Sequence, residues 1–385
     1  MARDVVLLAG YLVRCPLGGY AWQVLHYLAG LRALGFDAYF YEDTAYYSGS
    51  YDPSTNSENE GTATGVAFAT DFFAHFGLAD AWMFWDAQAE QLHGHPHIDR
   101  EDLLNRARVV ITLAPVTRLQ RRGNQRKLFI DLDPAFTQIR AAQGDRATCE
   151  LLREHDIHFT FGENIGRADC PVPTAGIEWH PTRQPVVLDL WQPLPTGDSE
   201  AFTTIGKWNE KRRDLAFEGR TFTWCKRLEW MNFLGLPARS RQPFVAGLDT
   251  ESVAGDSELL QRHGWGLANP VAISRDALRY RDFIRTSKGE FTVAKDLNVR
   301  LRSGWFSDRG ACYLAAGRPV VTQDTGFERV LPSGRGLFAV RSLEDAVAAV
   351  EQITADYENQ RVAARQLAEQ CFNATQILSD MLALL

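Results

Sequence analysis

The chain has 385 residues, a length that suits two domains that each bury a core of their own. Hydrophobic residues make up 45% of it and charged residues 23%, which is the balance of a globular protein in water rather than of a disordered one. The formal net charge of −7 argues against nucleic-acid binding, and no apolar run approaches the roughly 18 residues that a membrane-spanning helix requires.

The six cysteines are spread along the chain without a CxxC pair. This distribution is typical of reduced thiols in a cytoplasm, and not of a disulfide framework or a zinc site. The apolar part of the first residues is also too short for a signal peptide. We therefore expect a cytoplasmic protein without a transmembrane segment.

The first predicted elements are a strand, a helix and a second strand. Residues 5–9 are apolar and predict a buried strand, the helix over 21–34 carries leucines at helical spacing, and residues 38–41 form the second strand. Gly35 ends the helix, as glycine commonly does. No full GxGxxG fingerprint follows the first strand, which argues against a dinucleotide-binding dehydrogenase.

A long polar segment and a histidine motif come next. Residues 46–65 are rich in Ser, Thr, Asn, Gly and Tyr, so we expect a long loop there that covers an acceptor cleft, with a simple surface excursion as the alternative. An amphipathic helix is predicted over 68–76. His93, His95 and His97 alternate along a turn that contains glycine and proline, which cannot preorganise the tetrahedral ligands of a zinc site.

Carboxylates follow the later strands of this part of the chain. Strands are predicted at residues 108–113, 127–134 and 158–164. A carboxylate at a strand end that faces a cleft can take a proton from an acceptor hydroxyl, so Asp131, Asp133 and Glu163 are the candidate catalytic bases. Each could instead cap a helix or anchor hydrogen bonds. His26 is a further candidate, but its place in the second turn of a helix favours a packing role.

The proline-rich segment 193–197 is the best linker candidate, and residues 202–208 then begin a new sheet. Ser257 and Ser342 are the expected N-caps of two later helices. The pattern predicts helices at 222–235, 257–263, 276–286, 343–356 and 357–385, and strands at 243–248, 290–295, 320–322 and 334–340.

The most informative stretch begins with the loop 303–307. A short helix follows it, with Ser307 as the expected N-cap, so the free amides of the first turn would face the loop. Those amides and the helix dipole favour an anion. Arg302 and Arg309 flank the helix start with planar guanidinium groups suited to phosphate.

The same stretch continues into a buried strand. Gly317 ends the helix and Pro319 prevents its continuation. The β-branched run 320–322 predicts a strand of a parallel sheet. Gln323 and Asp324 follow at its carboxyl end, the edge at which open α/β sheets bind ligands.

This order of loop, helix, Gly-Xaa-Pro turn, strand and polar pair resembles the donor-binding segment of GT-B glycosyltransferases, two-domain enzymes that take sugars from nucleotide sugars. The resemblance implies that Ser307 and Arg309 contact the donor phosphates. It also implies that Gln323 and Asp324 hold the hydroxyl groups of the sugar ring.

Two other places fit the same family. Gly206 and Lys207 end the first strand of the second domain, where members approach the donor phosphates, and the Gly18-Gly19 loop resembles the first unit of these enzymes on the acceptor side. Lys295 adds positive charge just before the loop described above. The expected donor-binding residues are Gly206, Lys207, Lys295, Arg302, Ser303, Gly304, Ser307, Asp308, Arg309, Gln323, Asp324 and Thr325.

The chain departs from the family pattern in two respects. Many retaining members carry a glutamate five residues before the glycine, where this chain has Cys312, and plant-type members carry His and Glu around a core that corresponds to residues 304–307, which has neither. The subfamily and the stereochemical outcome are therefore open. Asp131 and Asp133 match the DxD metal pattern of GT-A glycosyltransferases, but the GT-B-like order around them favours a site without metal.

The resemblance implies an α/β chain with two Rossmann-like domains that face each other across a cleft. We expect an N-terminal acceptor domain over 1–195, a C-terminal donor domain over 196–360 and a helix over 361–385 that packs back on the first domain. The expected activity is metal-independent transfer of a sugar from a nucleoside diphosphate sugar to a small, hydrophobic acceptor, without a further cofactor. A homodimer is compatible with this expectation. The alternatives are a nucleotide-sugar epimerase of the same fold and a non-catalytic nucleotide-sugar-binding protein.

Overall fold

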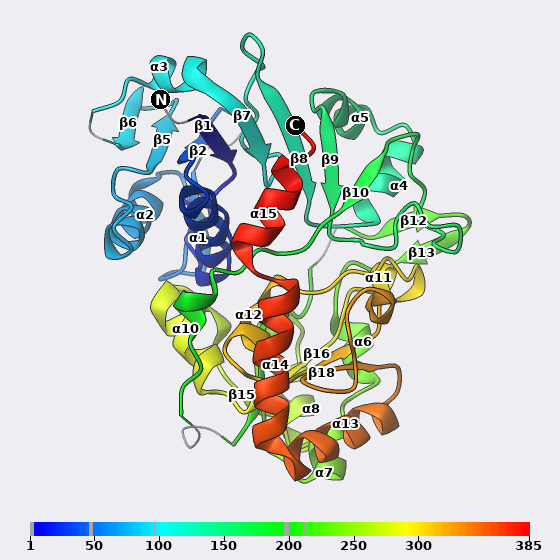
Figure 1. Cartoon of the computed structure of the whole chain (residues 1–385). Helices are drawn as coiled ribbons and strands as arrows, with labels where there is room; N and C mark the ends of the chain where they lie inside the picture. Colours follow the sequence, from blue (N-terminus) through cyan, green and yellow to red (C-terminus); the bar gives the residue numbers. More distant parts are fainter. Residues whose placement is uncertain (1–3, 46–48, 96, 196–199, 211–212) are drawn as a thin grey trace.

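Two sheets, one above the other in Figure 1, organise the chain. We call residues 4–195, which carry the larger sheet, the first half, and residues 200–355, which carry the smaller one, the second half. The computed structural model describes residues 4–45, 49–95, 97–195, 200–210 and 213–385.

The described residues of the first half form an eight-stranded sheet in the order β10-β9-β8-β7-β1-β2-β5-β6. Neighbouring strands are parallel except β5 and β6, which are antiparallel. The strands are β1 (Val5–Ala9), β2 (Asp37–Asp43), β5 (Trp82–Asp86), β6 (Gln91–Gly94), β7 (Ala107–Thr112), β8 (Arg126–Asp131), β9 (Ile157–Thr160) and β10 (Trp179–Pro181). The central strand β1 is buried along its whole length, as its unbroken apolar sequence predicts for a parallel sheet covered on both faces.

The helices of the first half connect these strands. They are α1 (Gly18–Ala33), α2 (Ala63–His75), α3 (Arg100–Arg106), α4 (Phe136–Ala142) and α5 (Arg146–Arg153), followed by the 3₁₀ turn η1 (Leu188–Trp191). Part of the predicted long loop instead forms a hairpin of β3 (Ser50–Asp52) and β4 (Ser57–Asn59), while residues 46–48 lie outside the described residues.

The described residues of the second half form a parallel six-stranded sheet in the order β15-β14-β11-β16-β17-β18. Its strands are β11 (Phe202–Gly206), β14 (Phe244–Leu248), β15 (Gly266–Leu267), β16 (Gly289–Thr292), β17 (Val320–Gln323) and β18 (Leu337–Val340). A separate hairpin consists of β12 (Leu215–Phe217) and β13 (Arg220–Phe222). The helical segments are α6 (Arg227–Met231), α7 (Leu236–Ser240), η2 (Thr250–Ser252), α8 (Asp256–Arg262), α9 (Pro270–Ser274), α10 (Ala277–Thr286), α11 (Asp296–Arg300), α12 (Asp308–Ala315), η3 (Phe327–Arg329) and α13 (Leu343–Ala355).

The last two helices join the halves. Figure 1 shows α14 (Tyr357–Cys371) running along the second half and α15 (Ala374–Leu382) continuing upward into the first half, beside α1. A Cβ atom added to Gly30 of α1 would lie 2.6 Å from Leu378 Cδ1, so the absence of a side chain at this glycine permits the close approach of the two helices.

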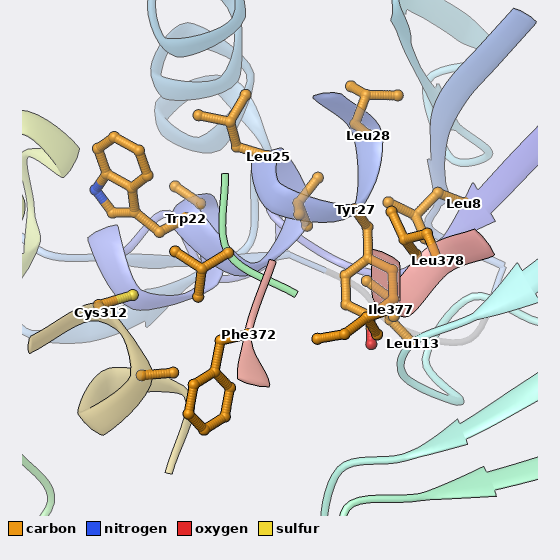
Figure 2. Close-up of a cluster of buried hydrophobic side chains, with 14 of the residues drawn as sticks. Leu8, Trp22, Leu25, Tyr27, Leu28, Leu113, Cys312, Phe372, Ile377 and Leu378 are labelled. Carbon is orange, nitrogen blue, oxygen red and sulfur yellow. The ribbon is translucent and has the colours of Figure 1, made fainter. Parts of the chain in front are cut away.

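One buried apolar cluster extends across both halves. Figure 2 shows Trp22 and Leu25 of α1 above Cys312 of α12, with Phe372 between α14 and α15 beneath them and Leu378 of α15 at the side. All five side chains are at most 9% exposed. The two sheets are therefore held together by shared hydrophobic burial rather than by the linker alone.

Several local predictions are confirmed and others are wrong: the single helix predicted over 357–385 is divided into α14 and α15. The strand–helix–strand opening is present, and Gly35 has a φ of +91° just beyond the end of α1. Residues 222–235 do not form one helix, because Phe222 ends β13 and α6 starts only at Arg227. Ser257 is not an N-cap, because it lies inside α8 and Gly255 occupies the cap position.

Two further findings concern the cysteines and the lengths of the helices. All six cysteines are free. Within the residues that the structure describes, no helix has both the length and the apolar character needed to cross a bilayer.

Candidate functional site

The N-terminus of α12 opens toward the first half. Ser307 holds the N-cap position, but its side chain makes no capping bond, and the Asp308 carboxylate accepts the Arg309 amide at 2.8 Å instead. Asp308 and Arg309 line a small cavity of about 20 Å³ together with Gly19 and His26 of α1. The helix start that the sequence singled out thus lies at the junction of the two sheets.

The Arg309 side chain points into the second half and is almost fully buried. Its Nε donates to Glu290 Oε1 at 2.5 Å, Nη1 to the Ile205 carbonyl at 2.6 Å and Nη2 to Thr292 Oγ1 at 3.0 Å. The pKa of Arg309 is raised by the Glu290 carboxylate despite the opposing effect of burial. These contacts fix the start of α12 to the ends of β11 and β16, so the geometry favours a positioning role for Arg309 over direct phosphate contact.

Lys226 is a cation at this site that the sequence reasoning missed. It occupies the N-cap position of α6, and within the described part of the chain its ammonium has no hydrogen bond or ion pair, only the Trp305 ring at 5.6 Å. Burial, together with the charges of Arg309 and Lys295, lowers the pKa of Lys226 to about 7. The wrongly predicted helix over 222–235 placed this residue in a helix interior, which concealed its position at a helix start.

Gly206 and Lys207 lie at the carboxyl end of β11. A Cβ atom at Gly206 would lie 3.5 Å from Arg309 Nη1, so this position adjoins the base of the site. Lys207 is largely exposed, and its ammonium is 3.8 Å from Glu210 Oε1. The Lys207 side chain is therefore free to move toward an anion at the junction.

The polar residues after β17 already have partners. Gln323 accepts the Ala294 amide at 3.2 Å and donates to Glu229 Oε2 at 2.5 Å. Asp324 is buried, and one of its oxygens lies 3.2 Å from Arg302 Nη1 and 2.8 Å from Arg341 Nη2. Sugar hydroxyls at these side chains would have to share or replace those contacts.

The loop before α12 is tied to the first half. The Ser303 carbonyl accepts the Asn164 amide at 3.0 Å, and Asn164 Nδ2 donates to the Arg302 and Gly326 carbonyls at 2.9 and 3.0 Å. Ser303 Oγ bonds Asn298 Oδ1 at 2.8 Å, and the Thr325 hydroxyl donates to the Trp305 carbonyl at 2.5 Å.

Gly304 allows that close contact. Its φ is +81°, and a Cβ atom there would lie 2.8 Å from the Asn164 backbone nitrogen. Both the backbone conformation and the space thus favour glycine.

The three candidate carboxylates of the first half differ in environment. Asp131 is buried and accepts hydrogen bonds from Thr137, Gln138 and Thr160, and burial raises its pKa to about 6. Glu163 lies beyond the end of β9 and forms a two-pronged pair with Arg183 at 2.7 and 3.0 Å.

Asp133 is the most exposed of the three, at 42% of its side chain. Its carboxylate is 3.0 Å from Lys295 Nζ and 3.8 Å from Arg213 Nη2, both in the second half. Lys295 in turn lies 3.3 Å from the centre of the Trp224 ring. The structure therefore brings a predicted catalytic carboxylate and a predicted donor-binding lysine together across the junction.

His26 is unsuited to act as a base in this structure. It is buried, and its ring nitrogens lie 3.1 Å from the Val187 amide nitrogen and 3.0 Å from Trp191 Nε1. Burial lowers the pKa of His26 to about 3. These contacts agree with the packing role that its helical position indicated.

The Gly18-Gly19 pair begins α1 and faces the second half. A Cβ atom at Gly18 would lie 2.6 Å from Tyr280 Cβ of α10, so a side chain here would separate the two helices. Trp22 Nε1 donates to the Ala277 carbonyl at 2.7 Å in the same contact. The glycines thus allow the first half to approach the second beside the start of α12.

We found no cluster of three or more metal-ligating side chains among the residues that the structure describes. In the histidine motif, His95 Nδ1 accepts the amides of His97 and Ile98 at 3.0 and 3.1 Å. The His95 ring thus stabilises the turn.

No protein-family model and no curated protein matches the sequence. Solved structures match over the full length. HepE from Anabaena, in complex with UDP and glucose, has a TM-score of 0.57 at 11% identity and covers 100% of both chains. Sucrose-phosphate synthase from Thermosynechococcus elongatus has a TM-score of 0.52 at 14% identity, over 99% of this chain and 98% of that one.

A third structure is an α-glucosyltransferase in complex with UDP, with a TM-score of 0.55 at 11% identity over 100% of this chain and 99% of that one. Identities this low speak for the architecture and not for a shared substrate. Together with the two largely parallel sheets, these full-length matches show that the chain has the GT-B fold.

Proposed function

We propose that the protein is a glycosyltransferase that moves a sugar from a nucleoside diphosphate sugar to a small acceptor. The observation that carries this proposal is the position of the α12 N-terminus beside a small cavity at the junction of the two sheets, with Lys226 close enough to interact electrostatically with Asp308 and Arg309. Backbone amides at a helix start and a nearby cation are what a diphosphate requires.

In the proposed reaction the bond between the sugar and the diphosphate breaks, and a bond to an acceptor oxygen forms. The departing diphosphate gains negative charge, which Lys226 and the amides of α12 stabilise. Because protein groups supply this positive charge, we expect transfer to proceed without a metal ion.

Asp133 is the carboxylate best placed to take the proton of an acceptor hydroxyl, because it is partly exposed and faces the second half. Tyr11 and Tyr20 lie on this side with ring centres 4.8 Å apart; burial, and to a smaller degree the Asp133 carboxylate, raises the pKa of both hydroxyl groups. This aromatic pair supports an acceptor with an apolar face. Residues 1–195 would then serve the acceptor and residues 196–360 the donor.

The test is thermal unfolding against a panel of nucleoside diphosphate sugars. A ligand that binds only the folded state stabilises it by RT ln(1 + [L]/Kd), so the donor should raise the melting temperature in a concentration-dependent way. Lys226→Met should abolish most of the shift. Lys288→Met is the matched control. Lys288 directly precedes β16, at the end of the second sheet that lies away from the junction, and its ammonium donates a hydrogen bond to Gln242.

A panel that gives no shift, or an equal shift with Lys226→Met, contradicts the proposal. Transfer is then assayed with the identified donor in the presence and absence of acceptors. Conversion of the donor to another sugar nucleotide without acceptor would indicate an epimerase. Binding without transfer or hydrolysis would indicate a nucleotide-sugar-binding protein, an alternative that the cysteine at position 312 supports.

A further inference from the structure

The second half also contacts the first at the β12–β13 hairpin. Figure 1 shows this hairpin beneath α4 at the right, where Gln143 Nε2 donates to the Ala216 carbonyl at 2.6 Å. Trp224 follows the hairpin, is 2% exposed, and has its ring centre 4.8 Å from that of Phe136 in α4. An apolar contact between the halves therefore lies on this side of the junction as well.

The indole ring of Trp224 is held in place by hydrogen bonds as well as by packing. The Trp224 amide donates to Asp214 Oδ1 at 2.8 Å, and Nε1 donates to Glu210 Oε2 at 2.7 Å. A ring that is buried, packed against another ring and hydrogen-bonded at its edge has little freedom to move. Any group that rests on this ring is therefore held at a defined position.

Two cations of the second half lie against the Trp224 ring. Lys295 Nζ is 3.3 Å from the ring centre, and the guanidinium carbon of Arg213 is 4.2 Å from it. A ring face attracts a cation most strongly when the cation is shielded from water, and the Lys295 side chain is only 19% exposed. Burial lowers the pKa of Lys295, so its positive charge relies on such partners for stabilisation. The indole ring therefore determines where both charges lie.

Each of these cations contacts a different oxygen of the Asp133 carboxylate. Lys295 Nζ is 3.0 Å from Oδ1, and Arg213 Nη2 is 3.8 Å from Oδ2. Asp133 itself belongs to the loop between β8 and α4 of the first half, and its side chain is 42% exposed. A carboxylate on such a loop can rotate unless charged partners hold it. The fixed ring thus acts on the proposed base through two cations.

We propose that Trp224 is a positioning residue for sugar transfer, which orients the Asp133 carboxylate through the two cations on its ring. This inference rests on the proposed function. Asp133 takes the proton of the acceptor hydroxyl, the acceptor oxygen forms a bond to the sugar, and the diphosphate leaves with the electron pair of the broken bond. Because a displacement of about 1 Å can cost roughly 10²-fold in rate, the orientation of the base affects this step directly. The base is then fully oriented only while the two halves are in contact.

The test compares two substitutions of Trp224, with the donor and acceptor that the transfer assay identifies. Trp224→Met keeps an apolar side chain but removes the ring, and it should lower kcat by roughly 10²-fold. Trp224→Phe retains an aromatic face for the cations and should recover most of that loss. Trp179→Met is the matched control, because Trp179 belongs to the same apolar cluster and donates from Nε1 to the Thr174 carbonyl at 3.1 Å. It should leave kcat unchanged.

The same substitution is then made in the Asp133→Asn background. If Trp224 acts through Asp133, Trp224→Met should cause no further loss of kcat there, because residues that act as a unit are not additive. An equal fractional loss in both backgrounds would indicate a general structural role and would overturn the inference. An unchanged kcat of Trp224→Met, or a Trp224→Phe enzyme as slow as Trp224→Met, would overturn it too.

Melting temperatures of all variants are measured first. Should Trp224→Met fail to fold, Arg213→Gln allows the same comparison at a side chain that is 40% exposed, with a loss of kcat expected in the wild-type background and none in the Asp133→Asn background. A wild-type protein that transfers no sugar would contradict the proposed function, and this inference with it. Wild-type transfer combined with additive losses would contradict this inference alone.

Discussion

Asp131 and Asp133 stand two residues apart and have different physical roles. Asp131 is the last residue of β8 and is buried beside α4, where three side chains donate hydrogen bonds to it. Its carboxylate therefore has a structural role. Asp133 lies past the strand end and meets Lys295 across the junction. Sequence alone left both open as bases, because the residues that approach each of them come from distant parts of the chain.

We expect Asp133→Asn to reduce the rate of sugar transfer by roughly 10²–10⁴-fold, the usual contribution of a general base, with little change in donor affinity. Asp131→Ala, in contrast, should lower the free energy of unfolding by about 1–3 kcal/mol, because it leaves buried donors without an acceptor. Steady-state kinetics and urea denaturation measure the two effects. An active Asp133→Asn enzyme would remove this residue from the mechanism.

The affinity for a nucleoside diphosphate should depend on the charge of Lys226. With its pKa lowered to about 7, this ammonium loses its proton as the pH rises above that value, so affinity should fall toward alkaline pH. At pH 8 binding should take up a proton. Calorimetry of UDP binding in two buffers of different ionisation enthalpy detects that uptake, and Lys226→Met should abolish the buffer dependence. A buffer-independent enthalpy for the wild-type protein would contradict the assignment.

At the scale of single elements, the loop from Arg302 to Ser307 depends on one glycine. Gly304→Ala should destabilise the protein by about 1–2 kcal/mol from the left-handed backbone and by about 1–3 kcal/mol more from the collision with Asn164. Gly334→Ala is the control, because Gly334 has a φ of +98° and no neighbour within 4 Å of the new methyl group. Chemical denaturation of the two variants measures the unfolding free energy that each one loses. Equal losses would show that contact with Asn164 adds nothing to the backbone effect.

The sequence predicted elements well where local pattern and packing agree. Strand β1 matches the predicted bounds, β11 begins at the predicted residue, and the capping box of Ser342 and Asp345 is present as its residues indicate. The pattern failed at residues 222–235, because Phe222 and Trp224 pack against the first half, a contact that no local spacing reveals.

The candidate site was predictable only in outline. The helix start at Ser307 lies at the junction, but the direction of the Arg309 side chain depends on where β11 and β16 end beneath it. The sequence did not indicate Lys226 for a related reason, because its position at a helix start depends on the β12–β13 hairpin that precedes it. Spacing along the chain indicates which residues form the helix, while the neighbouring strands decide which side chains face the cavity.

The whole molecule should unfold as one unit, because a single apolar cluster includes residues of both halves. Phe372, between α14 and α15, is fully buried in that cluster. Phe372→Ala should lower the free energy of unfolding by about 3–5 kcal/mol and separate the halves into two transitions. Differential scanning calorimetry measures both effects, with Leu384→Ala, at an exposed residue, as the control. Two transitions in the wild-type protein would show that the shared core does not couple the halves.

The return of α15 to the first half also bears on how the chain matures during its synthesis. The first sheet is translated early, but the helix that covers α1 at Gly30 is made only after the whole second sheet. Until α15 has left the exit tunnel of the ribosome, α1 lacks this partner. Completion of the first half therefore comes after the strands of the second sheet are already outside.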